Sequence, residues 1–484
     1  MRTHARRLHH FFLASSMFIA AAMTWIAPAA QAQTNYASTT GFGTYYRLFS
    51  ADSPWNIRPV QPVLGTYQIK KPIYNPGWIP TVGASSISLG VFMAKASDPA
   101  VTVYGTAGLS GVGDPDTGGY RNVTLPRWPA DVVPASGGDG HADIVDTVSG
   151  IVHSFYQLRK TNGRWTATMY GWSRIDGPGW GDGGHWSQGA RASGVPSSGG
   201  LIRKHEINDG AANYQHALAM SLPGQSLANG ISSPSYIAPA TTADNHAATY
   251  TGAIPLGARM MLPASFDTST IKNAALRKIA NTLKIYGAFV IDGNYDTAYG
   301  IYVENGGGFN LMPNNWDNEV VKSLETIRAA MRQVKGASSW IDGNGKTVNT
   351  TVKPRLLSMR GSWATTGTVT VVPNTFQTWE QAVVFPTTKN RISRTNYTNL
   401  SKVSWSKPST GTWVRFKSEA TGGARIRLQV RSGATVAYDS GYLQNDTLMA
   451  FPWPAANGGD ISLVLIAESG VNTASSVRGL LDVL

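Results

Sequence analysis

The chain of 484 residues contains no cysteine, and this absence removes several kinds of chemistry at once. Disulfide bonds, thiolate nucleophiles and zinc or iron–sulfur sites with cysteine ligands are all excluded. Charged side chains are also scarce, at 14% of the residues, against about a quarter in an average soluble domain. A chain of this length can bury a sizeable core without disulfides, and it predicts two to three domains.

Two sequence patterns of hydrolytic enzymes are missing as well. No GxSxG motif is present, so Ser193 is not predicted to be a nucleophile. The zinc-protease motif HExxH is also absent, because His205-Glu206 lacks the second histidine. A protease is therefore the least favoured enzyme class, and no metal-dependent site is predicted.

The first 32 residues have the pattern of a secretory signal peptide. Arg2, Arg6 and Arg7 precede an apolar run from Phe11 to Ile26, and Ala30-Gln31-Ala32 supplies small residues for cleavage. No later segment approaches the length of about 18 apolar residues needed to span a bilayer. We therefore expect an exported protein, secreted or periplasmic, that is not a transmembrane protein.

Positive charge is concentrated near the C-terminus. Residues 346–484 contain 15 Lys and Arg against seven Asp and Glu, whereas residues 34–345 contain 23 against 21. Such a surplus favours an anionic partner, and an acidic polysaccharide suits an exported protein better than a nucleic acid. The alternative is a solvated surface that keeps the protein soluble. The oligomeric state is left open.

Glycine, threonine, valine and aromatic residues dominate the chain, and turn signals recur every ten or so residues. We predict a mainly β fold: an antiparallel β-sandwich or jelly-roll-like main domain over 33–345, with two helices, followed by a smaller β-sandwich over 346–484. The strands, helices and linker predicted within these domains are 87–103 (a strand pair), 141–144 and 152–158 (a hairpin), 164–172, 271–286 (a helix capped near Asp267), 288–291, 317–334 (a helix), 336–345 (a linker), 368–372, 412–416, 424–430 and 461–466.

Five of the six histidines after the leader lie within about eighty residues: His141, His153, His185, His205 and His216. Histidine titrates near neutrality, so such clustering is typical of acid–base chemistry. On a strand, His141 and Asp143 share a face, and Asp143 could orient the imidazole as a catalytic base. Alternatively, the two form a structural hydrogen bond and Asp146 caps a turn. Metal binding by His141 and Asp143 is a third, weaker possibility.

A glycine-rich segment over 188–220 adds further candidates. Arg191 and Arg203 could bind carboxylate or sulfate groups through two parallel hydrogen bonds. Glu206 and His216 follow, and Tyr156 lies on the preceding hairpin. The alternative is that the arginines hold loop carbonyls in the interior. We predict His141, Asp143, Tyr156, Arg191, Arg203, Glu206 and His216 as catalytic candidates.

A loop rich in glycine and tryptophan lies between the hairpin and this segment. Its aromatic side chains could stack on the faces of sugar rings, although tryptophan is more often found in the core. We predict Trp172, Trp180, Trp186 and His185 as substrate-binding residues. No cofactor is predicted, except that Asp114 and Asp116 weakly resemble the start of a calcium loop.

Four sequence blocks resemble a family of exported bacterial proteins. They are Ser53-Pro54-Trp55-Asn56, the Gly-His-x3-Val-Asp block at 140–146, the Arg-x-Ser-Gly-Val-Pro and Gly-Leu-Ile-Arg blocks that lead to His216-Ala217-Leu218, and Ile254-Pro255-x-Gly257-x-Arg259. The resemblance covers about residues 50–295 and implies a shared β-rich fold. It carries no reaction, so it assigns no catalytic role.

Three functions remain open. The first is a polysaccharide lyase that cleaves an acidic polysaccharide by β-elimination, with His141 or His216 as base, Tyr156 as acid and Arg191 or Arg203 neutralising the uronate. The second is a glycoside hydrolase, which needs two carboxylates about 5–10 Å apart, from among Asp143, Asp146, Asp182 and Glu206. The third is a non-catalytic carbohydrate-binding or surface adhesion protein.

Overall fold

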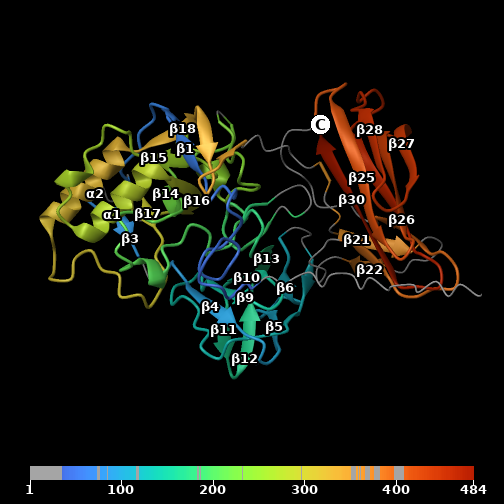
Figure 1. The fold of residues 1–484 in the computed structure, drawn as a ribbon, viewed down its shortest axis with the longest axis horizontal. Helices are drawn as coiled ribbons and strands as arrows, with labels where there is room; N and C mark the ends of the chain where they lie inside the picture. Colours follow the sequence, from blue (N-terminus) through green and yellow to red (C-terminus); the bar gives the residue numbers. More distant parts are fainter. Residues whose placement is uncertain are drawn as a thin grey trace, which may run out of the picture. The chain divides into compact units, whose positions relative to one another are not determined.

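The protein is described from a computed structural model, which covers residues 35–484 except for 73–76, 84–85, 116–118, 182–184, 186, 232, 296, 350–355, 358, 360, 366–370, 375–381 and 397–407. The described chain is mainly β with two α-helices, as predicted (Figure 1). None of the described helices is long and apolar enough to cross a membrane. The predicted signal peptide lies outside the described residues.

The first large sheet carries the histidine-rich hairpin. Its strand order is β4 (Gly90–Ala94), β9 (Ala142–Asp146), β10 (Ile151–Tyr156), β13 (Met169–Arg174), β6 (Val112–Gly113) and β7 (Tyr120–Arg121). Strands β9 and β10 form the predicted hairpin, with Ile151 opposite Asp146. The sheet is mixed, because β4 lies parallel to β9 and β13 parallel to β6.

A second sheet has four strands, and two of the strand predictions in this region differ from the structure. It contains β11 (Arg159–Thr161), β12 (Arg164–Ala167), β5 (Val101–Gly105) and β8 (Val123–Leu125). The predicted strand over 164–172 is broken at Thr168, so that β12 and β13 join different sheets. The predicted strand pair over 87–103 is wrong, because β4 and β5 are strands but pair with other partners.

A seven-stranded sheet forms the next layer. Its order is β2 (Val63–Leu64), β18 (Arg332–Gly336), β15 (Arg259–Met261), β16 (Ala288–Asn294), β14 (Leu218–Pro223), β17 (Gly300–Ile301) and β3 (Thr81–Val82). Alternate residues of β14 and β16 enter two different cores. Leu218 and Val290 pack towards the helices, whereas Ala219 and Phe289 pack towards the six-stranded sheet.

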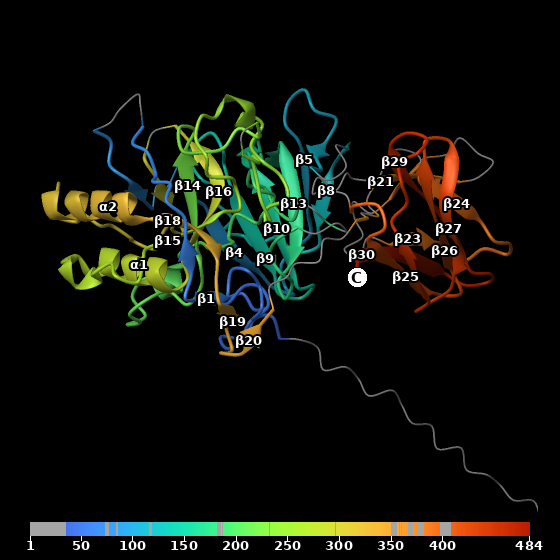
Figure 2. The same ribbon diagram turned by 90° about the horizontal axis from the view of Figure 1, so that it is seen from above.

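Two helices cover one face of this sheet (Figure 2). Helix α1 (Ala274–Ile285) begins after Asn273, whose side chain accepts a hydrogen bond from the backbone of Leu276. The predicted cap near Asp267 was wrong, because Asp267 caps a short 3-10 turn instead. Helix α2 (Asn318–Ala330) is capped by Asp317, and the residues predicted to end it belong to β18.

The segment around Trp55 and β1, which precedes the strands of these sheets, is held in place by buried side chains. Trp55 is only 1% exposed and stacks on Trp180 with ring centroids 4.7 Å apart. Strand β1 (Arg58–Val60) pairs with β19 (Ser339–Ile341), which pairs with β20 (Thr347–Val348). The predicted linker over 336–345 was therefore wrong, because its central residues form a strand.

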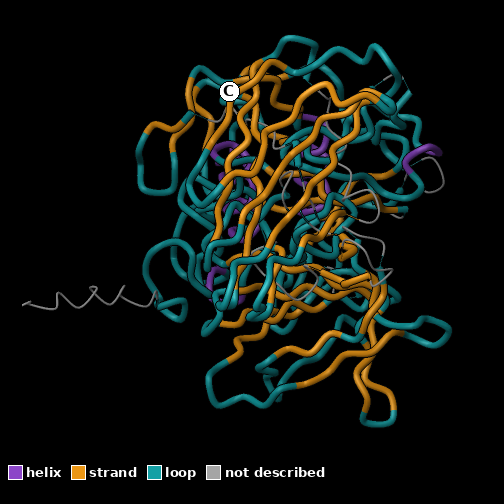
Figure 3. Tube along the Cα trace, turned by 90° about the vertical axis from the view of Figure 1, so that its right-hand side faces the viewer, coloured by secondary structure: helices purple, strands orange, loops and turns teal. Residues whose placement is uncertain are grey.

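The C-terminal part forms two sheets around a core of its own (Figure 3). One sheet contains β22 (Val371–Asn374), β21 (Gly361–Thr365), β24 (Ser393–Asn396), β29 (Ile461–Glu468), β26 (Arg425–Ser432) and β27 (Thr435–Leu443). The other contains β23 (Val383–Phe385), β30 (Ser475–Val483), β25 (Trp413–Thr421) and β28 (Leu448–Pro452). The predicted β-sandwich is present, and most of the strand predicted over 368–372 lies outside the described residues.

Candidate functional site

The six-stranded and seven-stranded sheets face each other, and polar side chains gather where they meet. Val145 and Val152 of the first sheet pack in the same core as Phe289 and Ile291 of the second. Because side chains alternate along a strand, Asp143 points to the same side as Val145. Tyr156 likewise shares a face of β10 with Val152. The hairpin therefore presents Asp143 and Tyr156 towards the seven-stranded sheet.

The glycine-rich segment fits between these sheets because it carries almost no side-chain volume at its tightest points. A Cβ atom at Gly189 would lie 2.2 Å from the backbone of Val195 and Pro196. One at Gly171 of β13 would lie 2.7 Å from the Cα of Gly189. The segment can thus pass close to the sheet and place Arg191 beside it.

Arg191 is the centre of the first group of candidates. Its side chain is almost completely buried, and its Nη1 lies 3.3 Å from Oδ2 of Asp292 on β16. Its Nη2 donates to the carbonyl of Ile87 at 3.1 Å, and its guanidinium lies 4.3 Å from the ring centre of Tyr302. The alternative of a buried arginine that holds a loop carbonyl describes Arg191, whereas binding of a ligand carboxylate or sulfate by Arg191 stays a prediction.

His141 lies beside this group as a neutral base. Its Nδ1 is 3.3 Å from Oγ of Ser197, and its ring centre is 5.5 Å from that of Tyr156. Burial and the nearby charge of Arg191 lower the pKa of His141 well below its usual value. Both effects disfavour the imidazolium form, so the ring is neutral near pH 7.

Asp143 does not orient His141, contrary to the prediction. The carboxylate is fully buried and accepts a hydrogen bond from the backbone N–H of Ser198 at 2.7 Å. Burial raises the pKa of Asp143, although the hydrogen bonds from Ser198 oppose this effect. His141 lies just before β9 and Asp143 within it, and each contacts a different serine of the glycine-rich segment.

Three carboxylates near Arg191 were missed by the sequence analysis: Asp139, Asp244 and Asp292. All three raise the pKa of the Tyr156 hydroxyl, after the larger effect of burial. Burial raises the pKa of Asp292 to about 6; Arg191 opposes this shift, while Asp244 and Asp139 add to it. No motif marks these aspartates, because they come from a strand end and two separate loops. We call these three residues, with His141, Asp143, Tyr156 and Arg191, the Arg191 cluster.

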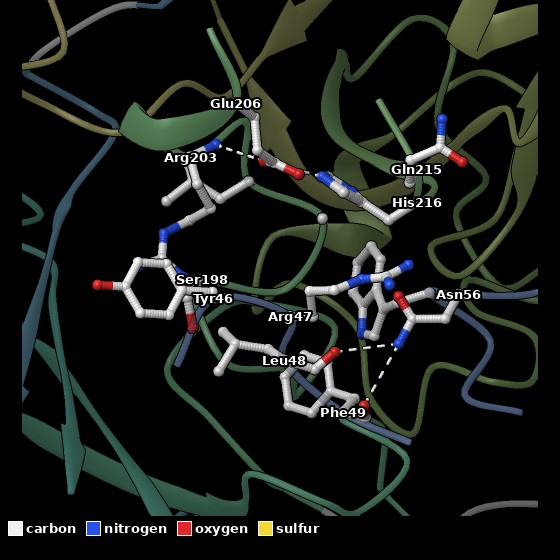
Figure 4. Close-up of a pocket in the computed structure, with 13 residues that line it drawn as sticks. Tyr46, Arg47, Leu48, Phe49, Asn56, Ser198, Arg203, Glu206, Gln215 and His216 are labelled. Carbon is white, nitrogen blue, oxygen red and sulfur yellow. Dashed lines mark hydrogen bonds and ion pairs between the residues drawn. The ribbon is translucent and has the colours of Figure 1, made fainter. Parts of the chain in front are cut away.

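The other predicted catalytic residues, Arg203, Glu206 and His216, line a small pocket (Figure 4). Nε2 of His216 lies 3.2 Å from Oε2 of Glu206, and Nδ1 of His216 lies 2.9 Å from the carbonyl oxygen of Ala217. Both ring nitrogens thus face acceptors, which favours the imidazolium. Burial opposes that charge, but Glu206 raises the pKa of His216 overall. His216 is therefore poorly placed to act as the base that the sequence suggested.

Glu206 and Arg203 are held in the same wall. The backbone N–H of Arg203 donates to Oε2 of Glu206 at 2.9 Å, and the Arg203 side chain pairs with Glu304 at 2.8 Å. Although burial opposes ionisation, the charge and hydrogen bond of His216 lower the pKa of Glu206 to about 2. Glu206 is thus a carboxylate at neutral pH. Ser198 also lines this pocket, so it borders both groups of candidates.

The predicted sugar-stacking residues lie in the interior. Trp180 is 1% exposed, and besides Trp55 it contacts Phe289 at 4.9 Å. Trp172 is 3% exposed and stacks on His185, with ring centres 4.0 Å apart. A ring needs an exposed face to stack on a sugar, so these three side chains are core residues here. Trp186 lies outside the described residues.

The remaining carboxylate candidates have structural surroundings. Asp146 forms two hydrogen bonds with Arg127, at 2.8 and 2.7 Å, and also accepts from the backbone of Val148 and Ser149. The capped-turn alternative therefore describes Asp146. Asp182 and Asp116 lie outside the described residues, and Asp114 is buried. Among the described residues, no group of three or more His, Asp or Glu side chains could hold a metal ion.

No protein-family model matches the chain, and no curated protein sequence is similar to it at a significant level. Two solved structures show slight similarity, each with 16% identity and a TM-score of 0.16. One is a carbohydrate-binding module, CBM61, in complex with β-1,4-galactotriose; the match covers 22% of this chain and 69% of that one. The other is a carbohydrate-binding module, CBM4, with 25% and 89% covered. Similarity at this level supports no inference about function.

Proposed function

We propose that the protein is an exported polysaccharide-binding protein and that the Arg191 cluster is its glycan site. The observation that carries this proposal is the set of partly exposed carboxylates and tyrosine around a buried arginine. The side chains of Asp139, Asp244 and Tyr156 are neither fully buried nor fully exposed, and that of Asp292 is 20% exposed. Carboxylates accept hydrogen bonds from neighbouring hydroxyls of one sugar, and a tyrosine ring offers an apolar edge beside its hydroxyl.

The buried arginine keeps this set of carboxylates in place. Arg191 has its own charge matched by Asp292 at 3.3 Å, and Tyr302 packs against the guanidinium. Both sheets supply residues from their strands, namely Asp143, Tyr156 and Asp292, and the other four residues of the cluster lie outside the strands. Such support fixes the positions of polar groups and lowers the entropy lost on binding.

Hydrolysis is the catalytic function that the cluster favours. Glycoside hydrolases use one protonated carboxyl group and one ionised carboxylate. Asp292, with a pKa of about 6, suits the proton donor to the glycosidic oxygen. Asp139 or Asp244 would take a proton from the attacking water, whose oxygen then bonds to the anomeric carbon as the glycosidic bond breaks. These residues differ from the four carboxylates that the sequence suggested for the pair, Asp143, Asp146, Asp182 and Glu206.

β-Elimination is supported by one observation and opposed by another. His141, Tyr156 and Arg191, one residue for each proposed lyase role, lie in the same cluster. However, Arg191 already faces Asp292, and two further aspartates would repel an anionic sugar at this place. A lyase needs an uncompensated positive group at the uronate carboxylate, so we place this reaction second.

Incubation of the protein with neutral and acidic polysaccharides tests these alternatives. Retarded migration through gels that contain one polysaccharide would support binding, and no retardation by any member of a broad panel would contradict it. New reducing ends without ultraviolet absorbance would identify hydrolysis. Absorbance from an unsaturated uronide would identify β-elimination instead. Binding without either product would leave a non-catalytic carbohydrate-binding protein.

A further inference from the structure

The pocket beside Glu206 and His216 is separate from the groups that the proposed function uses. Its charged lining residues are Arg47, Arg203, Glu206 and His216. With His216 held as an imidazolium, three cationic groups line the pocket, against Glu206 in the lining and Glu304, which pairs with Arg203 from outside it. The lining therefore has an excess of positive charge, unlike the acidic Arg191 cluster.

The two arginines are available to an anion to different degrees. Arg203 is 5% exposed, and its Nη2 has no hydrogen-bond partner among the described residues, although its Nε binds Glu304. A buried, unpaired donor on a charged group is costly unless a ligand satisfies it. The guanidinium of Arg47 lies over the ring of Phe42 at 3.9 Å, and no ion pair between described residues includes it.

One oxygen of the carboxylate in the wall already has hydrogen-bond partners. Oε2 of Glu206 already accepts from the backbone of Arg203 and from His216. Uncharged lining residues are mixed: Leu48 and Phe49 are apolar, whereas Asn56 and Gln215 carry amides. A sugar ring has the same mixture of apolar faces and hydroxyl edges, and its anionic form adds a carboxylate.

We propose that this pocket binds the carboxylate-bearing residue of an acidic sugar, a hexuronate, with the carboxylate between Arg47 and Arg203. The choice of a sugar rests on the proposed function, whereas the anionic character rests on the pocket alone. The polysaccharide would then contain both neutral and uronate residues, the uronate in this pocket and a neutral residue at the Arg191 cluster.

Calorimetric titration with D-galacturonate, D-galactose and inorganic sulfate as separate probes tests this inference. We expect binding of galacturonate that is at least about tenfold tighter than that of the other two, equivalent to about 1.4 kcal/mol. Binding of galactose with the same affinity as galacturonate would overturn the anionic character of the ligand. Binding of sulfate with the same affinity as galacturonate would identify a general anion site and overturn the proposal that the ligand is a sugar.

Three variants locate the binding. Arg47→Gln removes a partly exposed charge and should weaken galacturonate binding about fivefold or more. Arg164→Gln is the matched control, because Arg164 is exposed and stacks on Tyr104 in the same way, at 3.6 Å. Gln215→Glu places a negative charge at the exposed rim and should weaken binding as well. Unchanged binding in both pocket variants would overturn the proposal.

The outcome is distinguishable from failure of the proposed function. Polysaccharide retardation in gels depends on the Arg191 cluster, and it can be measured with the same Arg47→Gln protein. Suppose that the wild-type protein does not bind galacturonate and that only variants of the Arg191 cluster lose polysaccharide binding. This result would reject the proposed uronate pocket and retain the proposed glycan site.

Discussion

Five carboxylates between residues 143 and 304 differ in the groups that surround them. Asp146 is matched by Arg127, Glu206 by His216 and Glu304 by Arg203, so each of these three has a cationic partner. Asp292 has Arg191 on one side but two other aspartates nearby, and its pKa rises to about 6. Asp143 has no ion-pair partner among the described residues and accepts a hydrogen bond from the backbone of Ser198, while the charge of Arg191 also opposes the rise of its pKa. Perturbed carboxyl groups of this kind are concentrated at functional sites, which is why we base the site on Asp292.

Asp292→Asn should change the stability of the protein in a pH-dependent way. A carboxyl group whose pKa is higher in the folded state favours folding when protonated and opposes it as the pH rises from about 4 to about 6. Asparagine does not titrate. The free energy of unfolding of the variant, relative to wild type, should therefore increase over that interval, as urea denaturation would measure. A constant difference between pH 4 and 7 would contradict the raised pKa.

Glu206→Gln should show the opposite sign at lower pH. The pKa of Glu206 is lowered in the folded state, so its charge stabilises the fold above about pH 4.5, and this stabilisation is lost as the pH falls towards 2. The difference in the free energy of unfolding between wild type and the variant should become smaller over that range. Glu319→Gln serves as the control, because Glu319 is 56% exposed and lies on the surface of α2. A difference that stays constant in acid would show that the His216 pair contributes nothing.

At the scale of elements, the glycine-rich segment decides whether the site exists. Its close approach to β13 and its own tight turn depend on positions where a Cβ has no space. Gly189→Ala should therefore destabilise the protein by on the order of 2 kcal/mol, because the backbone of Val195 and Pro196 must move. Thermal unfolding measures this effect. Gly336→Ala is the control, since nothing lies within 4 Å of a Cβ there; an equal loss in both would contradict the packing argument.

Local sequence patterns predicted elements better than they predicted which elements meet. The hairpin over 142–156 and both helices followed from alternation and from the three-to-four residue spacing of apolar side chains. The sheet membership of β5 did not, because nothing in its own residues marks β12 as its partner. The linker over 336–345 was wrong for the same reason: β19 is specified by its pairing with β1, far away in sequence.

The candidate site shows the same limit. The sequence analysis named His141, Asp143 and Tyr156 together as candidates, and the structure places the rings of His141 and Tyr156 5.5 Å apart. Asp139, Asp244 and Asp292 could not be identified, because each lies in a different segment and has no motif. Trp180 was expected at the surface between glycines, but Trp55 and Phe289 cover its ring. Burial of this kind depends on contacts across more than one hundred residues.

At the scale of the whole molecule, charge is divided between regions with different roles. Basic residues of the C-terminal sandwich partly pair with its own acids, as Arg425 does with Glu468 and Arg427 with Asp439. The surplus of eight positive charges in residues 346–484 remains. It should attract an acidic polymer over distances that salt can screen.

Polysaccharide binding should therefore weaken as salt is added, and more so for acidic polymers than for neutral ones. The Debye length falls from about 10 Å at 0.1 M salt to about 3 Å at 1 M. Gel retardation at these two concentrations, with one neutral and one acidic polymer, measures the difference. Equal salt dependence for both polymers would show that the basic surplus takes no part in binding.

The central claim is that Asp292 and its neighbours bind the glycan. Its most direct test is a calorimetric titration of one retained polysaccharide into wild type, Asp292→Asn and Asp460→Asn, the last being an exposed carboxylate of the C-terminal sandwich. We predict that Asp460→Asn binds as wild type does and that Asp292→Asn binds at least about tenfold more weakly. Equal affinity of all three proteins, with Asp292→Asn shown to be folded, would contradict the assignment of the site.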